Sequence, residues 1–261
     1  MTSGVHPDLR ALGDLVAARG LAIGKPLEVM DETDSTNDVA KRAAKLGAPH
    51  GALFVAESQR AGRGRQGRPW VGVRGESILM SVLLRLSCDP RKLPPVALAV
   101  GLAARDAIAV ATGADVRIKW PNDVLIGGKK VAGVLVEAIV AGSNVEAVVV
   151  GVGVNVHQRT FPPEIADRAT SVALHAETPP DRATLLADLL AGIDREATHV
   201  AARGLGLVHA RITAADALAG RAVDLADARV RGVACGIDLD GALRVRTEDG
   251  TIRRVVSGEV T

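Results

Sequence analysis

Apolar residues recur along the chain in runs and alternations that predict both strands and helices. Runs of strand length lie at 27–33, 52–58, 77–86, 116–120, 124–126, 130–140 and 145–156. Stretches of helical length and periodicity lie at 7–19, 35–47, 93–111, 181–202 and 208–218. From about residue 220 the pattern changes to short alternating strands separated by Asp-Gly turn signals. The pattern therefore predicts two domains, over 1–217 and 218–261, of which the second is a small β-barrel.

Composition limits the class of protein. The formal charge of +2 over 261 residues creates no overall field toward nucleic acid or a membrane. Cys88 and Cys235 are too few and too far apart for a disulfide framework or a zinc site, which favours a reducing compartment. The N-terminus lacks the apolar core of a signal peptide, and the most apolar stretch, 93–110, is broken by Arg105 and Asp106. We therefore expect a cytoplasmic protein without a membrane span.

The segment 62–68, GRGRQGR, matches the G-x-G-x-x-G spacing of dinucleotide-binding loops. Such a loop opens a helix, whereas here Pro69 and Trp70 follow, so a nicotinamide oxidoreductase is not supported. Three arginines among flexible glycines repel one another, and they lose entropy when the loop is ordered. A strongly anionic ligand reverses that balance, because guanidinium groups bind phosphate and carboxylate bidentately. The loop is therefore predicted to bind an anion.

A second cationic segment, IKWPNDVLIGGKKVAGVLVE, covers residues 118–137. The residue before a proline is biased to extended backbone, so Trp120 is expected to end a strand and to expose Lys119, Asn122 and Asp123 around a turn. Lys130 opens the next strand, and the small residue Gly133 leaves room beside it. Together with the arginine loop, these lysines predict a phosphate site.

Uncharged polar residues stand at the ends of three other segments. Ser35 and Asp38 form an S-x-x-D helix start, in which Ser35 is read as the N-cap, while Thr36 and Asn37 are free to face a ligand. Gln59 ends a strand and has both a donor and an acceptor, which suits an uncharged polar ligand such as a urea. Asn155 ends the glycine-rich strand GVGVNV, in which glycine permits close approach of a backbone or a ligand.

With these motifs in this order, the chain resembles the biotin protein ligases (biotin–acetyl-CoA-carboxylase ligases). The match runs from about Asp34 to Asn155 and is carried by S-T-N, G-R-G-R-x-G-R-x-W, K-W-P-N-D, K-x-A-G and G-x-G-x-N. The resemblance implies an α+β fold in which a mixed sheet is flanked by helices, akin to class II aminoacyl-tRNA synthetases. It also implies that the C-terminal domain is SH3-like.

The resemblance also implies roles for the motif residues. Biotin would be bound by Ser35, Thr36, Asn37, Gln59, Arg63, Gly64, Arg65, Lys130 and Gly133. ATP and the adenylate would be bound by Arg63, Arg65, Arg68, Trp70, Lys119, Asn122 and Asn155. Lys130, Arg65 and Lys119 would be catalytic, with Lys130 between the biotin carboxylate and the α-phosphate. Mg²⁺ is implied on the phosphates, and Asp123 is its candidate ligand.

The implied reaction forms biotinyl-5′-AMP from biotin and ATP, and then transfers biotin to a lysine of a biotin carboxyl carrier domain. One alternative is a lipoate or octanoate ligase of the same fold. Gln59 and the S-T-N segment argue against it, because a ureido ring needs donors and acceptors and a dithiolane needs neither.

Another alternative is a biotin-responsive repressor. Only 33 residues precede Asp34, fewer than the winged-helix domain of regulated members, so we expect no specific DNA binding. The sequence does not indicate an oligomeric state.

Overall fold

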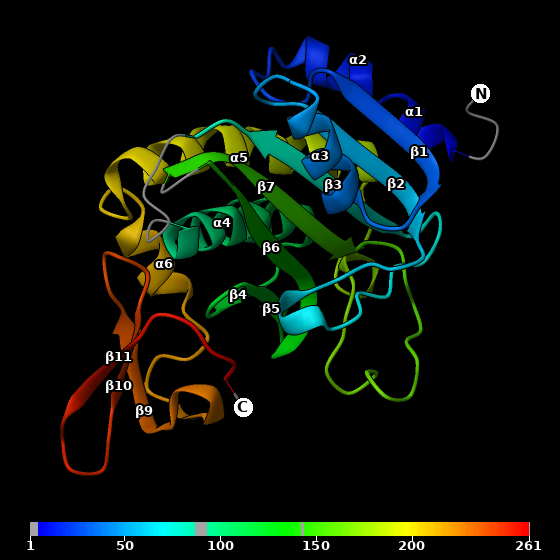
Figure 1. The fold of residues 1–261 in the computed structure, drawn as a ribbon. Helices are drawn as coiled ribbons and strands as arrows, with labels where there is room; N and C mark the ends of the chain where they lie inside the picture. The colour runs from blue at the N-terminus through cyan, green and yellow to red at the C-terminus, as the bar shows by residue number, and fades with distance from the viewer. Residues whose placement is uncertain (1–4, 87–92, 142–143, 261) are drawn as a thin grey trace.

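The computed structural model describes residues 5–86, 93–141 and 144–260, which form two sheets with helices around the larger one (Figure 1). The larger sheet has the strand order β1-β2-β3-β7-β6-β5-β4. Its strands are β1 (Leu27–Thr33), β2 (Leu53–Gln59), β3 (Ser77–Leu84), β4 (Val116–Lys119), β5 (Asp123–Ile126), β6 (Lys129–Ala141) and β7 (Asn144–Asn155). Only β1 and β2 pair in parallel, so the sheet is mixed, as expected.

Helices cover both faces of this sheet (Figure 1). They are α1 (Pro7–Arg10), α2 (Leu12–Ala18), α3 (Thr36–Lys45), α4 (Leu93–Thr112), α5 (Arg182–Arg203) and α6 (His209–Ala215). α4 and α5 pack against each other on one face, with α2 against α5, and α3 packs on β2, β3 and β7 from the other side. Because successive strand residues point to opposite faces, Leu53 and Val55 enter the large core under α4 and α5, whereas Phe54 joins a small core under α3.

On the face of the sheet that carries α3, one end of the strands is packed with apolar side chains and the other end is not covered by them. Three rows of residues cross β3, β7 and β6 on this face: Leu83–Val149–Glu137, Ser81–Gly151–Leu135 and Leu79–Gly153–Gly133. The first row lies at the edge of the small core, and the next two contain glycines. Because glycine has no side chain, the sheet is thin at this point and leaves room above it.

α4 contains the one stretch of the described residues, Pro94–Thr112, that is long and apolar enough to cross a membrane. Most of this stretch is buried inside the protein, where it packs on the sheet and on α5. Arg105 and Asp106 pair with each other near its centre.

The C-terminal residues form a separate antiparallel sheet of the order β11-β10-β9-β8 (Figure 1). Its strands are β8 (Ala222–Leu225), β9 (Val230–Ile237), β10 (Leu243–Arg246) and β11 (Ile252–Val255). Gly241 lies in the β9–β10 turn, and its carbonyl accepts a hydrogen bond of 2.9 Å from Nε1 of the buried Trp120. This bond ties the small sheet to the turn after β4.

Several predicted boundaries are wrong, for local reasons. The helix expected over 7–19 is two short helices, because Ala11 N–H bonds to Asp8 one residue too early for an α-helix. The helix expected over 208–218 ends at Ala215, since Ala217 N–H bonds instead to Ile118 O on β4. The strand expected over 77–86 ends at Leu84, and Cys88 lies outside the described residues.

Candidate active site

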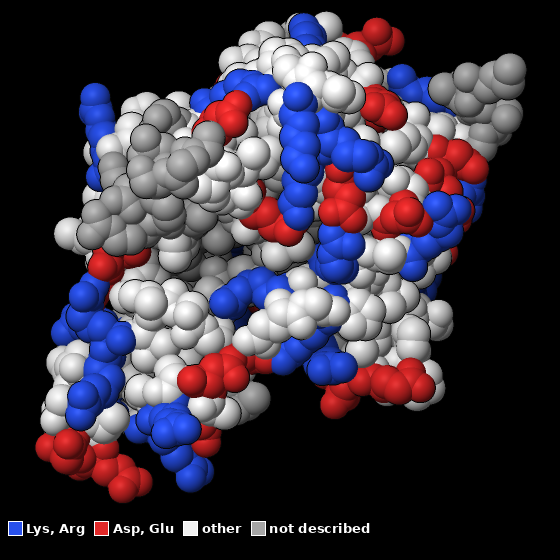
Figure 2. Space-filling view, in the orientation of Figure 1, with Lys and Arg blue, Asp and Glu red and all other residues white. Residues whose placement is uncertain are grey.

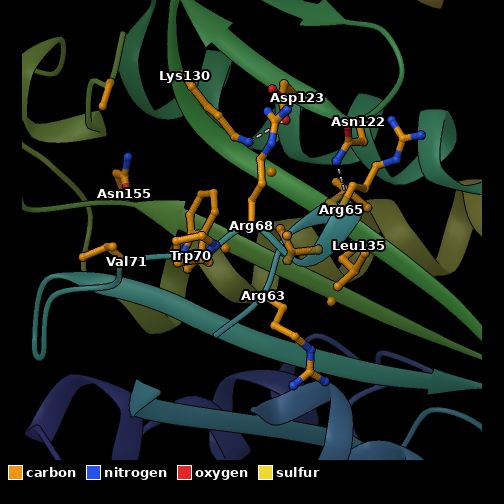
Figure 3. Close-up of a pocket in the computed structure, with 18 of the residues that line it drawn as sticks. Arg63, Arg65, Arg68, Trp70, Val71, Asn122, Asp123, Lys130, Leu135 and Asn155 are labelled. Atoms are coloured by element: carbon orange, nitrogen blue, oxygen red, sulfur yellow. Dashed lines mark hydrogen bonds and ion pairs between the residues drawn. The ribbon is translucent and has the colours of Figure 1, made fainter. Parts of the chain in front are cut away.

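A cavity of about 470 Å³ lies on the glycine-lined face of the larger sheet, between α3, the 62–70 loop and the turn after β4 (Figure 3). All the site residues predicted from the sequence line it: Ser35, Thr36, Asn37, Gln59, Arg63, Gly64, Arg65, Arg68, Trp70, Lys119, Asn122, Asp123, Lys130, Gly133 and Asn155. They come from segments more than 100 residues apart. The fold therefore brings the separate motifs to one place.

The end of the cavity next to α3 is lined by uncharged polar groups. Thr36 donates its backbone N–H to Oε1 of Gln59 at 2.7 Å, and its hydroxyl lies 3.1 Å from the same oxygen. Oγ of Ser81 lies 2.7 Å from the Thr36 hydroxyl and 2.5 Å from Asn37 Oδ1. Ser35, Thr36, Asn37 and Ser81 are all buried, and the side chains of Thr36, Asn37 and Ser81 find their hydrogen-bond partners within the protein.

Ser35 does not cap α3 in the way that the S-x-x-D pattern predicts. Its carbonyl accepts from Asp38 and Val39, but its side chain makes no capping bond within the described residues. Asp38 instead pairs with Arg63 at 2.6 Å and lies 3.8 Å from Lys41. The helix therefore begins where predicted, but Asp38 contacts the arginine loop.

The glycines of β6 and β7 are approached by side chains of the site. A Cβ on Gly151 would lie 2.3 Å from Oδ1 of Asn37, and a Cβ on Gly153 would lie 2.3 Å from the ring of Trp70. A Cβ on Gly133 would lie 3.0 Å from both Trp70 and the end of Lys130. The sequence predicted close approach of a backbone or a ligand at this strand, whereas in the structure the side chains of Asn37 and Trp70 make it. The indole Nε1 of Trp70 is buried and has no hydrogen-bond partner among the described residues.

Lys130 lies at the centre of the other, cationic end of the cavity (Figure 3). Its Nζ is 2.6 Å from Asp123 Oδ1 and 5.3 Å from the centre of the Trp70 ring. Its backbone is held by the segment 168–170, because Lys130 N–H donates to Arg168 O and Lys130 O accepts from Thr170 N–H. Lys129, its neighbour, points to the carbonyl of Ala166. The lysine predicted to be catalytic is therefore fixed in place, and the adjacent one lies elsewhere.

The three loop arginines each have a partner, so the repulsion expected from the sequence is partly offset within the protein. Arg63 binds Asp38 on α3, and this hydrogen bond raises the pKa of Arg63 and lowers that of Asp38. Arg65 donates to Gly258 O at 3.1 Å, and burial lowers its pKa. Arg68 pairs with Glu259. Figure 3 shows Arg63 turned away from Lys130, toward α3. The loop therefore bridges the large domain and the C-terminal segment.

Two polar residues of the turn and of β7 also reach the backbone around the cavity. Asn122 donates its side-chain amide to Val134 O at 2.7 Å and accepts at its own carbonyl from Val134 N–H, which joins the turn to β6. Asn155 donates to Thr170 O at 2.9 Å. Both side chains therefore hold the walls of the cavity.

The sequence did not single out Ser81 and Glu137, which both contact Asn37. The only signal for either is a polar residue that interrupts an apolar strand, in SILMSVLL and VAGVLVE. That signal does not tell which face of the sheet the residue occupies, because the register of β3, β7 and β6 decides it.

A family model described as the biotin/lipoate A/B protein ligase family matches residues 29–155, and one for the biotin protein ligase C-terminal domain matches 219–261. The bifunctional ligase/repressor BirA of Bacillus subtilis is 34% identical over 243 residues, which are 91% of this chain and 74% of that protein. The chain belongs to the biotin protein ligase family. The first match contains every site residue predicted from the sequence.

Two further comparisons are with a ligase sequence and a ligase structure. The biotin–[acetyl-CoA-carboxylase] ligase of Mycobacterium tuberculosis is 37% identical over 188 residues, 70% of this chain and 68% of that one. The structure of the biotin protein ligase from Aquifex aeolicus in complex with biotin and ATP superposes with a TM-score of 0.77 at 31% identity. It covers 91% of this chain and 98% of that one.

Proposed function

We propose that this chain is an ATP-dependent biotin–[acetyl-CoA-carboxylase] ligase. The observation that carries the proposal is the division of the cavity into two ends. One end has the uncharged hydrogen-bonding groups of Thr36, Asn37 and Gln59, and the other has Lys119, Lys130, Arg65 and Arg68. A ligand with a neutral polar ring, an apolar chain and a carboxylate fits such a cavity. A polyphosphate beside the carboxylate would match the remaining positive side chains.

A carboxylate does not acylate an amine at neutral pH, so it must be activated first. A carboxylate oxygen of biotin attacks the α-phosphorus of ATP, and the bond to the bridging oxygen breaks to release pyrophosphate. The carrier lysine then attacks the acyl carbon of biotinyl-5′-AMP as a free amine, loses a proton, and AMP leaves. Both substrates of the first step are anions, so catalysis consists mainly of positioning and charge neutralisation.

We assign this neutralisation to Lys130, Lys119 and Arg65. Lys130 lies at the cationic end of the cavity, where we place the carboxylate and the α-phosphate. We assign Ser35, Thr36, Asn37, Gln59 and Gly133 to biotin, Arg63 and Gly64 to the part of the loop that covers biotin and its adenylate, and Arg68, Trp70, Asn122 and Asn155 to the nucleotide side. Closure of the loop would keep water from the adenylate.

Mg²⁺ on the phosphates is part of the proposal. No group of three or more His, Cys, Asp or Glu side chains in the described part of the chain forms a metal cage. Mg²⁺ needs none, because it commonly binds one or two carboxylates, substrate phosphates and water. Asp123 fits the single carboxylate contact, and the ion would neutralise phosphate charge there.

We also propose that the C-terminal sheet is an SH3-like domain starting near residue 218, that the acceptor is the biotin carboxyl carrier domain of an acyl-CoA carboxylase, and that the enzyme is cytoplasmic. Figure 2 shows basic and acidic side chains interspersed over the face in view. This supports recognition of a carrier by shape and local pairs, since no single-sign field covers that face.

ATP–pyrophosphate exchange with different acids distinguishes biotin ligation from the ligation of lipoate or octanoate. Biotin should support ATP–pyrophosphate exchange far better than either acid, because buried polar groups left unpaired cost about 1–3 kcal/mol each. Transfer of labelled biotin to a carrier domain should follow. Comparable exchange with lipoate or octanoate would assign the chain to the sister activity.

A second role as a biotin-responsive repressor is the alternative, because several relatives are bifunctional ligase/repressors. We propose that this chain does not bind a specific DNA site. A gel-shift assay with promoter DNA at physiological salt should give weak binding that biotin does not change. A tight, biotin-dependent complex would refute this part of the proposal.

A further inference from the structure

A carboxylate that the proposed reaction does not use lies behind the uncharged end of the cavity. Glu137 is on β6, and Oε2 of its side chain accepts a hydrogen bond from Nδ2 of Asn37 at 2.7 Å. Its other oxygen, Oε1, lies 2.5 Å from Nζ of Lys41 on α3. Asn37 is only 4% exposed, so little water can replace a lost partner of its amide.

The charge of Glu137 decides which way the amide of Asn37 points. A carboxylate beside an ammonium group accepts hydrogen bonds and donates none, so it takes the amide nitrogen. Asn37 Oδ1 is then on the other side, 2.5 Å from Oγ of Ser81. Ser81 is fully buried and has a single proton, which this bond uses. Its oxygen can therefore only accept from the Thr36 hydroxyl, whose single proton is then not available to Gln59 Oε1.

The orientation of Gln59 is set separately, by the backbone. Oε1 of Gln59 accepts the backbone N–H of Thr36 at 2.7 Å, so this oxygen is already occupied. The amide nitrogen, Nε2, is the group of Gln59 left to a ligand, and it lies on the side of Gly62 in the loop. Glu137 thus fixes the donors and acceptors of Asn37, Ser81 and the Thr36 hydroxyl, whereas the Thr36 backbone fixes Gln59.

We propose that Glu137 is a positioning residue that sets the direction of the hydrogen bonds of Asn37, Ser81 and the Thr36 hydroxyl, and thereby makes the Thr36 hydroxyl oxygen an acceptor for the ligand at the inner end of the cavity. The inference rests on the proposed function, in which the ligand is a cyclic urea with two N–H donors and one carbonyl acceptor. A ring of this kind is sensitive to direction, because reversing Asn37 frees the Thr36 proton and sets a donor against a ring N–H.

Three variants of one hydrogen bond test the proposal. In Glu137→Gln the amide oxygen is taken by the Lys41 ammonium, so the amide nitrogen faces Asn37 and the direction is reversed. We expect KM for biotin in pyrophosphate exchange to rise about tenfold with kcat little changed, as loss of a charged hydrogen bond predicts. Asn37→Asp sets two carboxylates against each other and should raise KM for biotin further.

The double variant Asn37→Asp/Glu137→Gln exchanges donor and acceptor across this bond. The new carboxylate accepts from the Gln amide nitrogen, and its other oxygen still accepts from Ser81, with the total charge unchanged. We expect KM for biotin to return most of the way to the wild-type value. A double variant no better than Asn37→Asp, or a Glu137→Gln enzyme with unchanged KM for biotin, would overturn the proposal.

Controls separate this role from general folding. Glu146→Gln removes a carboxylate that is 54% exposed on the neighbouring strand β7 and pairs with Arg85, so it should leave KM for biotin unchanged. In Glu137→Gln, KM for ATP and Tm should also stay near the wild-type values, and a fall in Tm with a rise in both KM values would indicate a structural role and contradict the proposal. A wild-type enzyme without biotin-dependent exchange would instead refute the proposed function, before any variant is compared.

Discussion

At the scale of single residues, two side chains of the same type can have different roles because they contact different partners. Lys129 and Lys130 are neighbours, but only Lys130 lines the cavity, where it contacts Asp123 and the Trp70 ring. The predicted site residues all line the cavity, each from a motif, but the cavity is also lined by residues that the sequence did not single out, such as Arg168 and Val260. The sequence could not predict the partners of the site residues, since Asp38, Ser81 and Glu137 reach the site only through the packing of α3 and the register of the sheet.

The two lysines give the first prediction. Lys130→Ala should lower the rate of biotin-dependent ATP–pyrophosphate exchange by about 10²-fold or more, as loss of a preorganised charge in a catalytic site does. Lys129→Ala should keep most of the activity, because Nζ of Lys129 is directed to the Ala166 carbonyl at the surface. Equal losses in the two variants would show that the catalytic lysine is wrongly assigned.

The second prediction concerns Gly153. A Cβ there would meet the Trp70 ring at 2.3 Å, so Gly153→Ala should push Trp70 out of its place and reduce adenylate formation more than tenfold, since misplacing a group by about 1 Å can cost 10²-fold. The change in indole environment should shift the fluorescence of the protein. Gly206→Ala, where a Cβ meets nothing within 4 Å, is the matched control and should be silent in both measurements.

At the scale of elements, a buried arginine joins three parts of the chain. Arg182, at the start of α5, is fully buried and pairs at 2.8 Å with both Asp8 on α1 and Glu57 on β2. β2 ends at Gln59, so this cluster supports a strand that enters the site. The sequence predicted each of these elements, but it gave no sign of the cluster, because the three residues are up to 174 positions apart.

The third prediction is that Arg182→Met destabilises the fold by about 3–5 kcal/mol, because it leaves the buried Glu57 and the mostly buried Asp8 without their cation. Chemical denaturation at neutral pH measures this. The matched control is Arg19→Met. It removes a partly exposed ion pair with Asp188, which lies on α5 like Arg182, and it should cost about 0–1 kcal/mol. A similar cost for both variants would mean that the cluster contributes no more than a surface pair.

The fourth prediction is the pH dependence of this cluster. Burial raises the pKa of Asp8, but the hydrogen bonds from Arg182 and His6 outweigh it and hold that pKa well below its usual range. A lowered pKa stabilises the fold above the unfolded value of about 3.9, and this stability is lost as the pH falls below it. Wild-type stability should therefore decrease from about pH 4 downward. Asp8→Asn should be less stable at pH 7 and show a shallower decrease, and parallel curves would argue against the assignment.

At the scale of the whole molecule, the arginine loop links the two sheets. Gln66 at the loop tip contacts Asp227 in the C-terminal domain at 2.8 Å, and Arg65 and Arg68 reach Gly258 and Glu259. The change of pattern near residue 220 predicted a separate C-terminal unit. The contact between the two units could not be predicted, because it joins a loop to the C-terminal segment through single pairs of residues far apart in the sequence.

The last prediction is that this bridge makes loop closure depend on both the ligands and the C-terminal segment. Trypsin cuts after arginine in flexible chain, so cleavage at Arg63 and Arg65 reports how open the loop is. Biotin with ATP places negative charge beneath the loop, and cleavage should slow strongly once the adenylate forms, whereas AMP alone should protect little.

Glu259→Gln removes a partner of Arg68, so it should speed cleavage without ligand, while Glu248→Gln in the exposed β10–β11 turn should not. If biotin and ATP leave the cleavage rate unchanged, the loop does not close over the adenylate. The wild type and Glu259→Gln could instead be cut equally fast without ligand and be protected equally by ligands. In that case the C-terminal segment does not contribute, and closure is a property of the large domain alone.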